Sequence, residues 1–124
     1  MAKSILIVED NQTNAQLLKD VLVIKYYDVN VVTNGDDALA SIEKSKPDLV
    51  LMDVQLPGMD GYEVTCKMRE NPQTKELPII AVTAYALKGD REKAMEAGCD
   101  GYMSKPINTR ELPKMVERLI GKAV

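Results

Sequence analysis

The sequence contains no histidine, and its two cysteines, Cys66 and Cys99, do not form a Cys-x-x-Cys pair. A zinc site and a catalytic triad with a histidine base are therefore effectively excluded. Isolated cysteines usually behave as small apolar residues, so we expect both thiols to be reduced and to lie in the core. Because reduced thiols are typical of the cytoplasm, we expect a cytoplasmic protein.

Long apolar runs are absent as well, since none approaches the roughly 20 residues that a membrane-spanning helix needs. The N-terminal residues 1–4 lead directly into an apolar segment and show no signal-peptide pattern. The net charge is −3 without a clustered basic stripe, which argues against a nucleic-acid interface. Neither Gly-x-Gly-x-x-Gly nor a P-loop is present, so a nucleotide-binding module is disfavoured.

What the sequence does contain is a regular alternation of short apolar runs and amphipathic segments. We expect strands at 4–8, 28–33, 48–53, 77–83 and 101–104, and helices at 11–25, 36–46, 61–70, 88–97 and 108–120. Strict alternation predicts an α/β fold with a parallel sheet, helices on both faces and right-handed crossovers. Five such units fit a doubly wound, flavodoxin-like (βα)5 fold of three layers with strand order 2-1-3-4-5. We expect residues 1–124 to form this one domain, with no output domain.

The start of the last helix is ambiguous. Asn108 and Glu111 have the spacing of a capping box, which would begin the helix at Asn108. Pro113, however, fits well only in the first turn of a helix, where its missing N–H has no partner to lose. Either the helix begins later, or its first turn is distorted.

Asp53 ends the most informative of the expected strands. The run Asp48–Asp53 is apolar on both faces, and the turn signals Pro57-Gly58 and Asp60-Gly61 follow it. A strand buried on both faces belongs in a parallel sheet that is covered by helices. Asp53 is then expected at the carboxyl end of the sheet, where open α/β proteins place their chemistry.

Four further polar residues come at the ends of apolar runs: Glu9, Asp10, Thr83 and Lys105. In the strand order 2-1-3-4-5 the first and third strands are neighbours, so Glu9, Asp10 and Asp53 should converge at the switch point of the sheet. Each residue alone has an ordinary explanation, as a helix cap, a turn residue, a strand end or a solvated lysine. Only their common position favours a functional site.

Three converging carboxylates repel one another, at a cost of about 4 kcal/mol for each pair at about 4 Å and an effective dielectric near 20. Such a cluster takes up protons or binds a hard cation, and oxygen ligands beside solvent favour Mg²⁺. We expect Asp10, Asp53 and the backbone carbonyl of Gln55 as direct ligands, with Glu9 acting through a bound water.

Mg²⁺ would also attract a phosphoryl group. Asp53 is then the expected nucleophile, forming an acyl phosphate, while Lys105 and Thr83 offer an ammonium and a hydroxyl to phosphate oxygens. A cis Lys105-Pro106 bond would hold the ammonium inward.

Four segments carry a resemblance to the response-regulator receiver domains of the CheY-like family, over essentially the whole chain: Ile5–Asn11, Asp48–Gly61, Ala81–Ala84 and Tyr102–Pro106. All five motif positions of the family are matched, and their joint occurrence is very specific. The stretches 84–90 and 97–102 are most similar to DivK-type single-domain regulators and to receivers of hybrid kinases, and we prefer the stand-alone interpretation.

The resemblance implies that Asp53 accepts a phosphoryl group from a sensor histidine kinase or a histidine phosphotransfer protein. It also implies that Thr83 and Tyr102 form a switch pair, and that a downstream protein binds the face built from the helix at 88–97, the strand at 101–104 and the last helix. Its own catalysis would be limited to self-phosphotransfer and slow self-dephosphorylation, with Gln55 and Tyr85 setting the lifetime of the phosphorylated state. We expect a monomer, and leave open whether the phosphorylated form dimerises.

Other classes fit less well. A phosphatase with an aspartyl nucleophile would want an acid two residues after Asp53, where Gln55 stands. An adaptor that works without phosphorylation would be expected to lack one of the acidic or lysine positions, and none is missing. A role as a phosphate shuttle or sink stays open. Specificity for partners is expected on the first helix, around Asn14, Leu17 and Leu18.

Overall fold

The computed structural model describes residues 2–84 and 89–124. Strands and helices alternate along these residues in the predicted order. The strands are β1 (Ser4–Val8), β2 (Asp28–Val32), β3 (Leu49–Asp53), β4 (Ile79–Thr83) and β5 (Gly101–Ser104). The helices are α1 (Gln12–Val23), α2 (Gly35–Lys44), α3 (Gly61–Glu70), α4 (Asp90–Ala97) and α5 (Glu111–Ile120).

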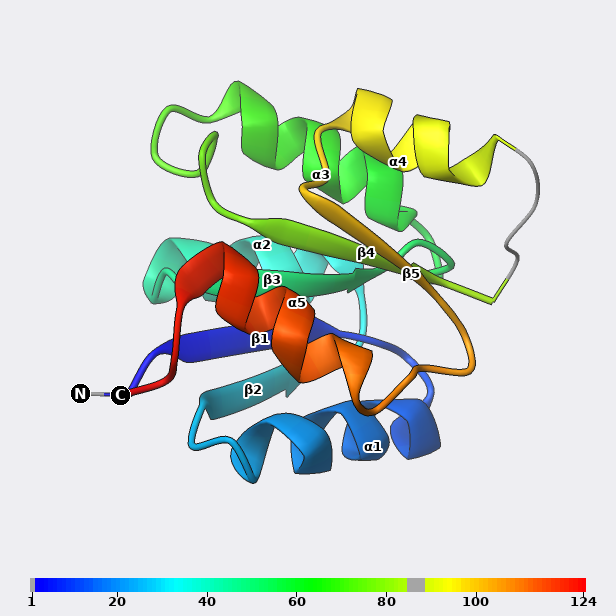
Figure 1. Ribbon diagram of the computed structural model, residues 1–124. Coiled ribbons are helices and arrows are strands. Elements are labelled where there is room, and N and C mark those ends of the chain that lie inside the picture. Colours follow the sequence, from blue (N-terminus) through cyan, green and yellow to red (C-terminus); the bar gives the residue numbers. More distant parts are fainter. Residues whose placement is uncertain (1, 85–88) are drawn as a thin grey trace.

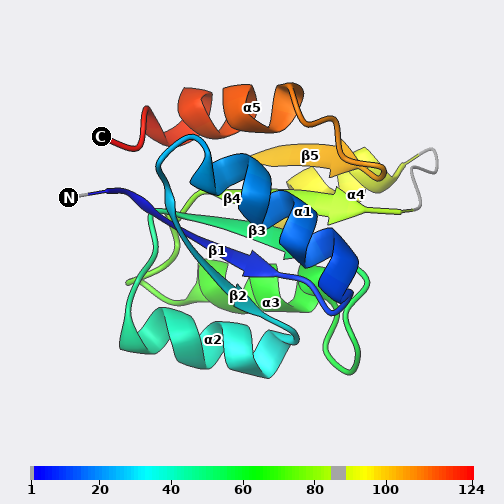
Figure 2. The same ribbon diagram turned by 90° about the horizontal axis from the view of Figure 1, so that it is seen from below.

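The strands form one parallel sheet in the order β2-β1-β3-β4-β5, which confirms the predicted topology. Figures 1 and 2 show the three layers: α1 and α5 cover one face of the sheet, and α2, α3 and α4 cover the other. β1 and β3 are neighbours, with Ile7 opposite Leu51. The switch point therefore lies between the ends of these two strands.

Each face of the sheet has its own apolar core. All residues of β3 and β4 are buried, because helices cover both of their faces. On one side, α2 and α3 contribute Ala38, Ile42, Val64 and Met68; on the other, α1 and α5 contribute Leu18, Leu22, Leu112 and Val116. The two cores fix the sheet, and with it the positions of the side chains at the strand ends.

Side-chain caps mark the starts of α1, α2 and α3. Asn11 caps α1, because its side chain accepts a hydrogen bond from the backbone N of Asn14 at 3.0 Å. Asp60 caps α3 in the same way, through the backbone N of Glu63 at 2.9 Å. Gly61 follows, and a Cβ built on it would lie 2.4 Å from the backbone O of Asp53. Glycine therefore allows α3 to start directly against the end of β3.

The structure corrects several predicted boundaries. α5 begins at Glu111 rather than at Asn108, and Asn108 Oδ1 accepts the N–H groups of Arg110 (2.9 Å) and Glu111 (3.0 Å) in the turn before it. Pro113 is thus in the first turn, which resolves the ambiguity in favour of the later start. β4 begins at Ile79 rather than residue 77, after a proline that has no N–H to pair. The predicted start of α4 at residue 88 lies outside the described residues.

The prediction that both cysteines lie in the core is wrong in part. Cys99 is buried and free, as expected, but Cys66 is exposed because the inward face of α3 is taken by Val64 and Met68. On α1, Leu18 and Leu22 are buried, whereas Leu17 and Val23 are exposed. No helix among the described residues is long and apolar enough to cross a membrane.

Candidate functional site

Asp53 is the last residue of β3 and is only 4% exposed. The chain turns sharply after it, so that the backbone N of Gln55 donates a hydrogen bond to Asp53 Oδ1 at 2.9 Å. The close start of α3 at Gly61 holds the same strand end from the other side. The sequence predicted a turn at Asp60-Gly61 and a helix from Gly61, but not the close approach of Gly61 to the backbone of Asp53.

Lys105 follows β5 and reaches back to the ends of two other strands. Its Nζ donates to Glu9 Oε1 at 2.6 Å and to Asp53 Oδ2 at 3.2 Å, and its side chain is 16% exposed. The backbone N of Lys105 also donates to the carbonyl of Thr83 at 2.7 Å, and the Lys105-Pro106 bond is cis. The structure thus brings together the ammonium and the carboxylates that the sequence placed at separate strand ends.

Glu9 and Asp10 follow β1. Glu9 is 1% exposed, and its backbone N donates to the carbonyl of Val32 at 3.0 Å, whereas Asp10 is exposed. One oxygen from each of Glu9, Asp10 and Asp53 lies within 4.8 Å of the others. Among the described residues, Glu9 Oε2 is the buried side-chain oxygen or nitrogen that has no hydrogen-bond partner. Three carboxylates, one of them with an unsatisfied buried oxygen, suit a hard divalent cation such as Mg²⁺.

The electrostatics of the cluster reflect its burial. Loss of hydration, together with the hydrogen bond and charge of Asp53, raises the pKa of Glu9 to about 7, and Lys105 only partly offsets this. Burial by itself lowers the pKa of Lys105, but the hydrogen bond to Glu9 and the charges of Asp53 and Glu9 outweigh it, so the pKa is raised. Lys105 therefore stays positively charged, while two buried acids compete for one cation.

Thr83 and Tyr102 lie on adjacent strands. Thr83 ends β4, is 1% exposed and stands opposite Ser104 in the register of β5. Tyr102 is half-buried in β5 and packs against the core under α2, α3 and α4. Gln55 Oε1 accepts from the backbone N of Ala84 at 3.3 Å, which links the loop after β3 to the end of β4. Tyr85, the other residue predicted to set the lifetime, lies outside the described residues.

These features define a class: a doubly wound α/β protein with a lysine-bridged acidic site at the switch point of its sheet. The family profile of the response regulator receiver domain matches residues 5–117. The chain belongs to this family, and it is a receiver domain homologous to DivK and to the CheY-like response regulators of two-component systems.

The relatives agree in length as well as in fold. The polar-differentiation response regulator DivK of Brucella anthropi is 40% identical over 123 residues, which are 99% of this chain and 100% of DivK. The receiver domain of the sensor histidine kinase PA1611 of Pseudomonas aeruginosa, solved with a magnesium ion coordinated in its active site cleft, is 39% identical with a TM-score of 0.90, covering 98% of this chain and 100% of that one. The chemotaxis protein CheY4 of Vibrio cholerae is 28% identical with a TM-score of 0.89, covering 96% and 99%.

Proposed function

We propose that this receiver domain, residues 1–124, accepts a phosphoryl group on Asp53 from the phosphohistidine of a sensor kinase or a histidine phosphotransfer protein. In this step a bond forms between an Asp53 carboxylate oxygen and phosphorus, the N–P bond of the phosphohistidine breaks, and the released imidazole takes up a proton from solvent. The observation that carries the proposal is the contact of Asp53 Oδ2 with Lys105 Nζ at 3.2 Å, beside the cluster of three carboxylates.

The charges of the cluster support this role. Lys105 is positioned to offset negative charge on a phosphoryl oxygen, and Thr83, buried at the end of the neighbouring strand, supplies a hydroxyl. Asp10, Asp53 and the backbone carbonyl of Gln55 would hold Mg²⁺, with Glu9 acting through a water. When bound, the ion neutralises charge on the donor and acceptor oxygens. A related receiver domain, that of PA1611, was solved with magnesium in its active site cleft.

The proposed output is a change of protein-binding surface. Thr83 and Tyr102 act as a switch pair across β4 and β5, and the face formed by α4, β5 and α5 binds a downstream protein. Figure 1 shows β5 at the edge of the sheet, with α4 and α5 on its two sides. Gln55 and Tyr85 set the lifetime of the acyl phosphate. We place this activity in the cytoplasm, in keeping with two free thiols.

Intact-mass spectrometry after incubation with acetyl phosphate tests the proposal. We expect one phosphate adduct on the wild type with Mg²⁺, none with EDTA, and none on Asp53→Asn. Decay of the adduct after removal of acetyl phosphate should differ in Gln55→Arg without loss of the adduct itself. Absence of any adduct on a folded wild type with Mg²⁺ would overturn the proposal and favour an adaptor that works without phosphorylation.

A further inference from the structure

A second site lies away from the acidic cluster, where the end of α1 meets α5 and the residues after it. A groove with a volume of about 660 Å³ runs between these segments. Its floor is partly built by Tyr27, which is 6% exposed and whose hydroxyl donates to the carbonyl of Gly121 at 2.7 Å. The backbone N of Lys3 donates to the carbonyl of Ala123 at 3.0 Å and fixes the segment that forms the other wall. The groove is therefore a built feature of the fold.

Tyr26 lines the groove, and its backbone has a conformation that is unfavourable for any residue with a side chain. Tyr26 has φ of 73°, in the left-handed region, and is the one non-glycine residue with positive φ in the described part of the chain. The backbone N of Tyr26 bonds to the carbonyl of Val23 and that of Tyr27 to the carbonyl of Leu22, the pattern that ends a helix at a position where glycine is preferred. The residue is nevertheless 74% exposed. Folding thus gains little from this side chain, which points to a binding role.

The charges around the groove are mostly positive, although the protein as a whole carries a net charge of −3. Four exposed cations and one acid contribute to its lining: Lys25, Arg110, Lys114, Lys122 and Glu117. None of the four cations forms an ion pair with a residue that the structure describes. Their charges are therefore available to a negatively charged ligand.

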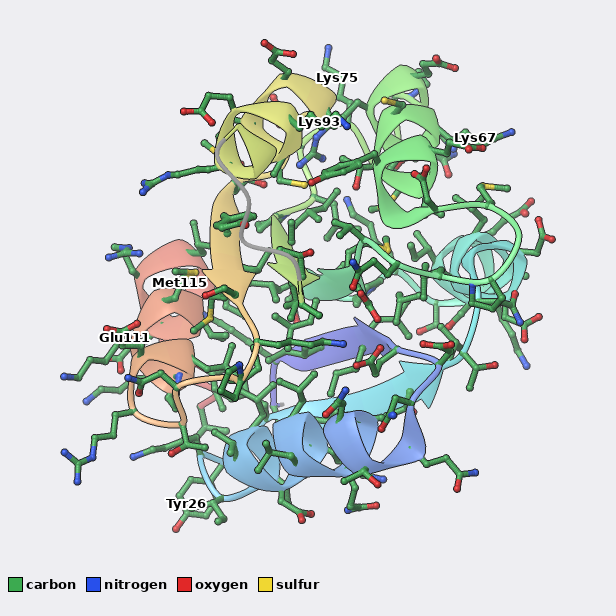
Figure 3. All side chains as sticks on the ribbon, turned by 90° about the vertical axis from the view of Figure 1, so that its right-hand side faces the viewer. Tyr26, Lys67, Lys75, Lys93, Glu111 and Met115 are labelled. Atoms are coloured by element: carbon green, nitrogen blue, oxygen red, sulfur yellow. The ribbon has the colours of Figure 1, made fainter. Side chains whose placement is uncertain are left out.

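The spacing of these cations decides which ligand fits. Arg110 precedes α5 and Lys122 follows it, and the 10 residues of the helix between them rise about 15 Å. A compact phosphate would contact only part of this row. An extended peptide of about six residues, at about 3.3 Å per residue, can contact the whole row and place an apolar side chain against Tyr26. Figure 3 shows Tyr26 on the side of the molecule that carries Glu111 and Met115 of α5, far from Lys67, Lys75 and Lys93.

We propose that this groove binds an extended acidic segment of a partner protein, with Tyr26 packing against an apolar side chain of that segment and the surrounding cations pairing with its carboxylates. The site is separate from the phosphorylation site. Asp53 does not line the groove, so the proposed contacts of the acidic segment do not involve the acidic cluster directly.

Titration of ¹⁵N-labelled protein with a capped peptide of about six residues that alternates glutamate and leucine tests the proposal. We expect saturable shifts of the backbone amides of Tyr26, Lys114 and Lys122, and none with the peptide that carries lysine in place of glutamate. The affinity should fall about tenfold in Tyr26→Gly, as is typical of a buried aromatic contact. Lys114→Glu should weaken binding, and Lys75→Glu, the same charge change on the far side, should not.

Three results would overturn the proposal. The first is the absence of groove shifts at millimolar peptide. The second is saturation of the groove by tripolyphosphate but not by the peptide, which would indicate a phosphate site. The third is obtained with Tyr26→Gly. Glycine adopts the left-handed conformation without strain, so we expect this variant to unfold at the same temperature as the wild type or higher. A clearly lower unfolding temperature, or unchanged binding, would make Tyr26 a structural residue instead.

Discussion

Two clusters of charged side chains, one around Arg69 and one around Lys105, differ in how many of their charged and polar atoms have hydrogen-bond or ion-pair partners. Arg69 Nε donates to the carbonyl of Gly98 at 2.9 Å, its Nη1 donates to three carbonyls between α3 and β4, and its Nη2 pairs with Asp100 Oδ2 at 2.9 Å. Asp100 Oδ2 also accepts from the backbone N of Ile79 at 2.9 Å. One cation meets one anion, and each nitrogen of the guanidinium has a partner.

The cluster at the carboxyl ends of the strands is unbalanced by comparison. Lys105 meets both Glu9 and Asp53, the nearby Asp10 adds a third carboxylate, and Glu9 Oε2 is buried without a partner among the described residues. An unsatisfied buried oxygen and surplus negative charge destabilise a folded protein unless a ligand completes them. The difference indicates that the Arg69 cluster holds the fold together and the Lys105 cluster is kept for binding.

The largest expected effect is a loss of folding stability when the Arg69 cluster is disrupted. Arg69→Ala removes the guanidinium donors to three carbonyls of the loop before β4 and leaves Asp100 without its cation. We therefore expect a loss of about 3 kcal/mol in the free energy of unfolding, measured in urea. Lys67→Ala, on the exposed side of the same helix, is the matched control and should change stability by less than about 0.5 kcal/mol. Equal effects of the two substitutions would remove the distinction between the clusters.

The Lys105 cluster should make the folded protein less stable as the pH rises, whereas a carboxylate in a stabilising ion pair makes it more stable. The folded protein raises the pKa of Glu9 from 4.5 to about 7, so the protonated acid contributes stability that is complete below pH 4.5 and is lost as the pH rises through about 7. In EDTA, the wild type should lose up to about 3 kcal/mol over this range relative to Glu9→Gln, at about 1.4 kcal/mol per pKa unit. Parallel stability curves for the two proteins would show that Glu9 is not strained by its surroundings.

The smallest expected effect is a change in how fast the thiol groups of Cys66 and Cys99 are modified. Burial raises the pKa of Cys99, although a hydrogen-bond contact with Thr65 at 3.8 Å and the nearby Arg69 lower it in part, so little reactive thiolate forms. Iodoacetamide should modify the exposed Cys66 first in the wild type and in Glu9→Gln. In Arg69→Ala, labelling of Cys99 should be about tenfold faster, because its neighbours Gly98 and Asp100 are released. Unchanged protection of Cys99 would show that Arg69 does not hold this region.

Sequence reasoning predicted what depends on pattern and topology. Asp53, Glu9, Asp10, Thr83 and Lys105 could be assigned to one edge because the strand order places the strand ends together. It could not predict the Arg69–Asp100 pair, since no local pattern joins residues 31 positions apart. Nor could it predict the left-handed backbone conformation of Tyr26, because the residue that ends a helix in this conformation is usually glycine. The exposure of Cys66 depends on how far α3 is rotated about its axis, and composition does not fix that rotation.

The most direct test for a cation site at Glu9, Asp10 and Asp53 is the effect of Mg²⁺ on thermal unfolding of the wild type and of Asp10→Asn, each referenced to EDTA. Asp10 is exposed, so its substitution should leave the metal-free protein as stable as the wild type or slightly more so. At about ten times its dissociation constant, a bound ion adds about 1.4 kcal/mol, and we predict this stabilisation for the wild type and its loss in Asp10→Asn. A wild type that Mg²⁺ does not stabilise, or a variant that it stabilises equally, would contradict the claim that the unbalanced cluster is kept for a cation.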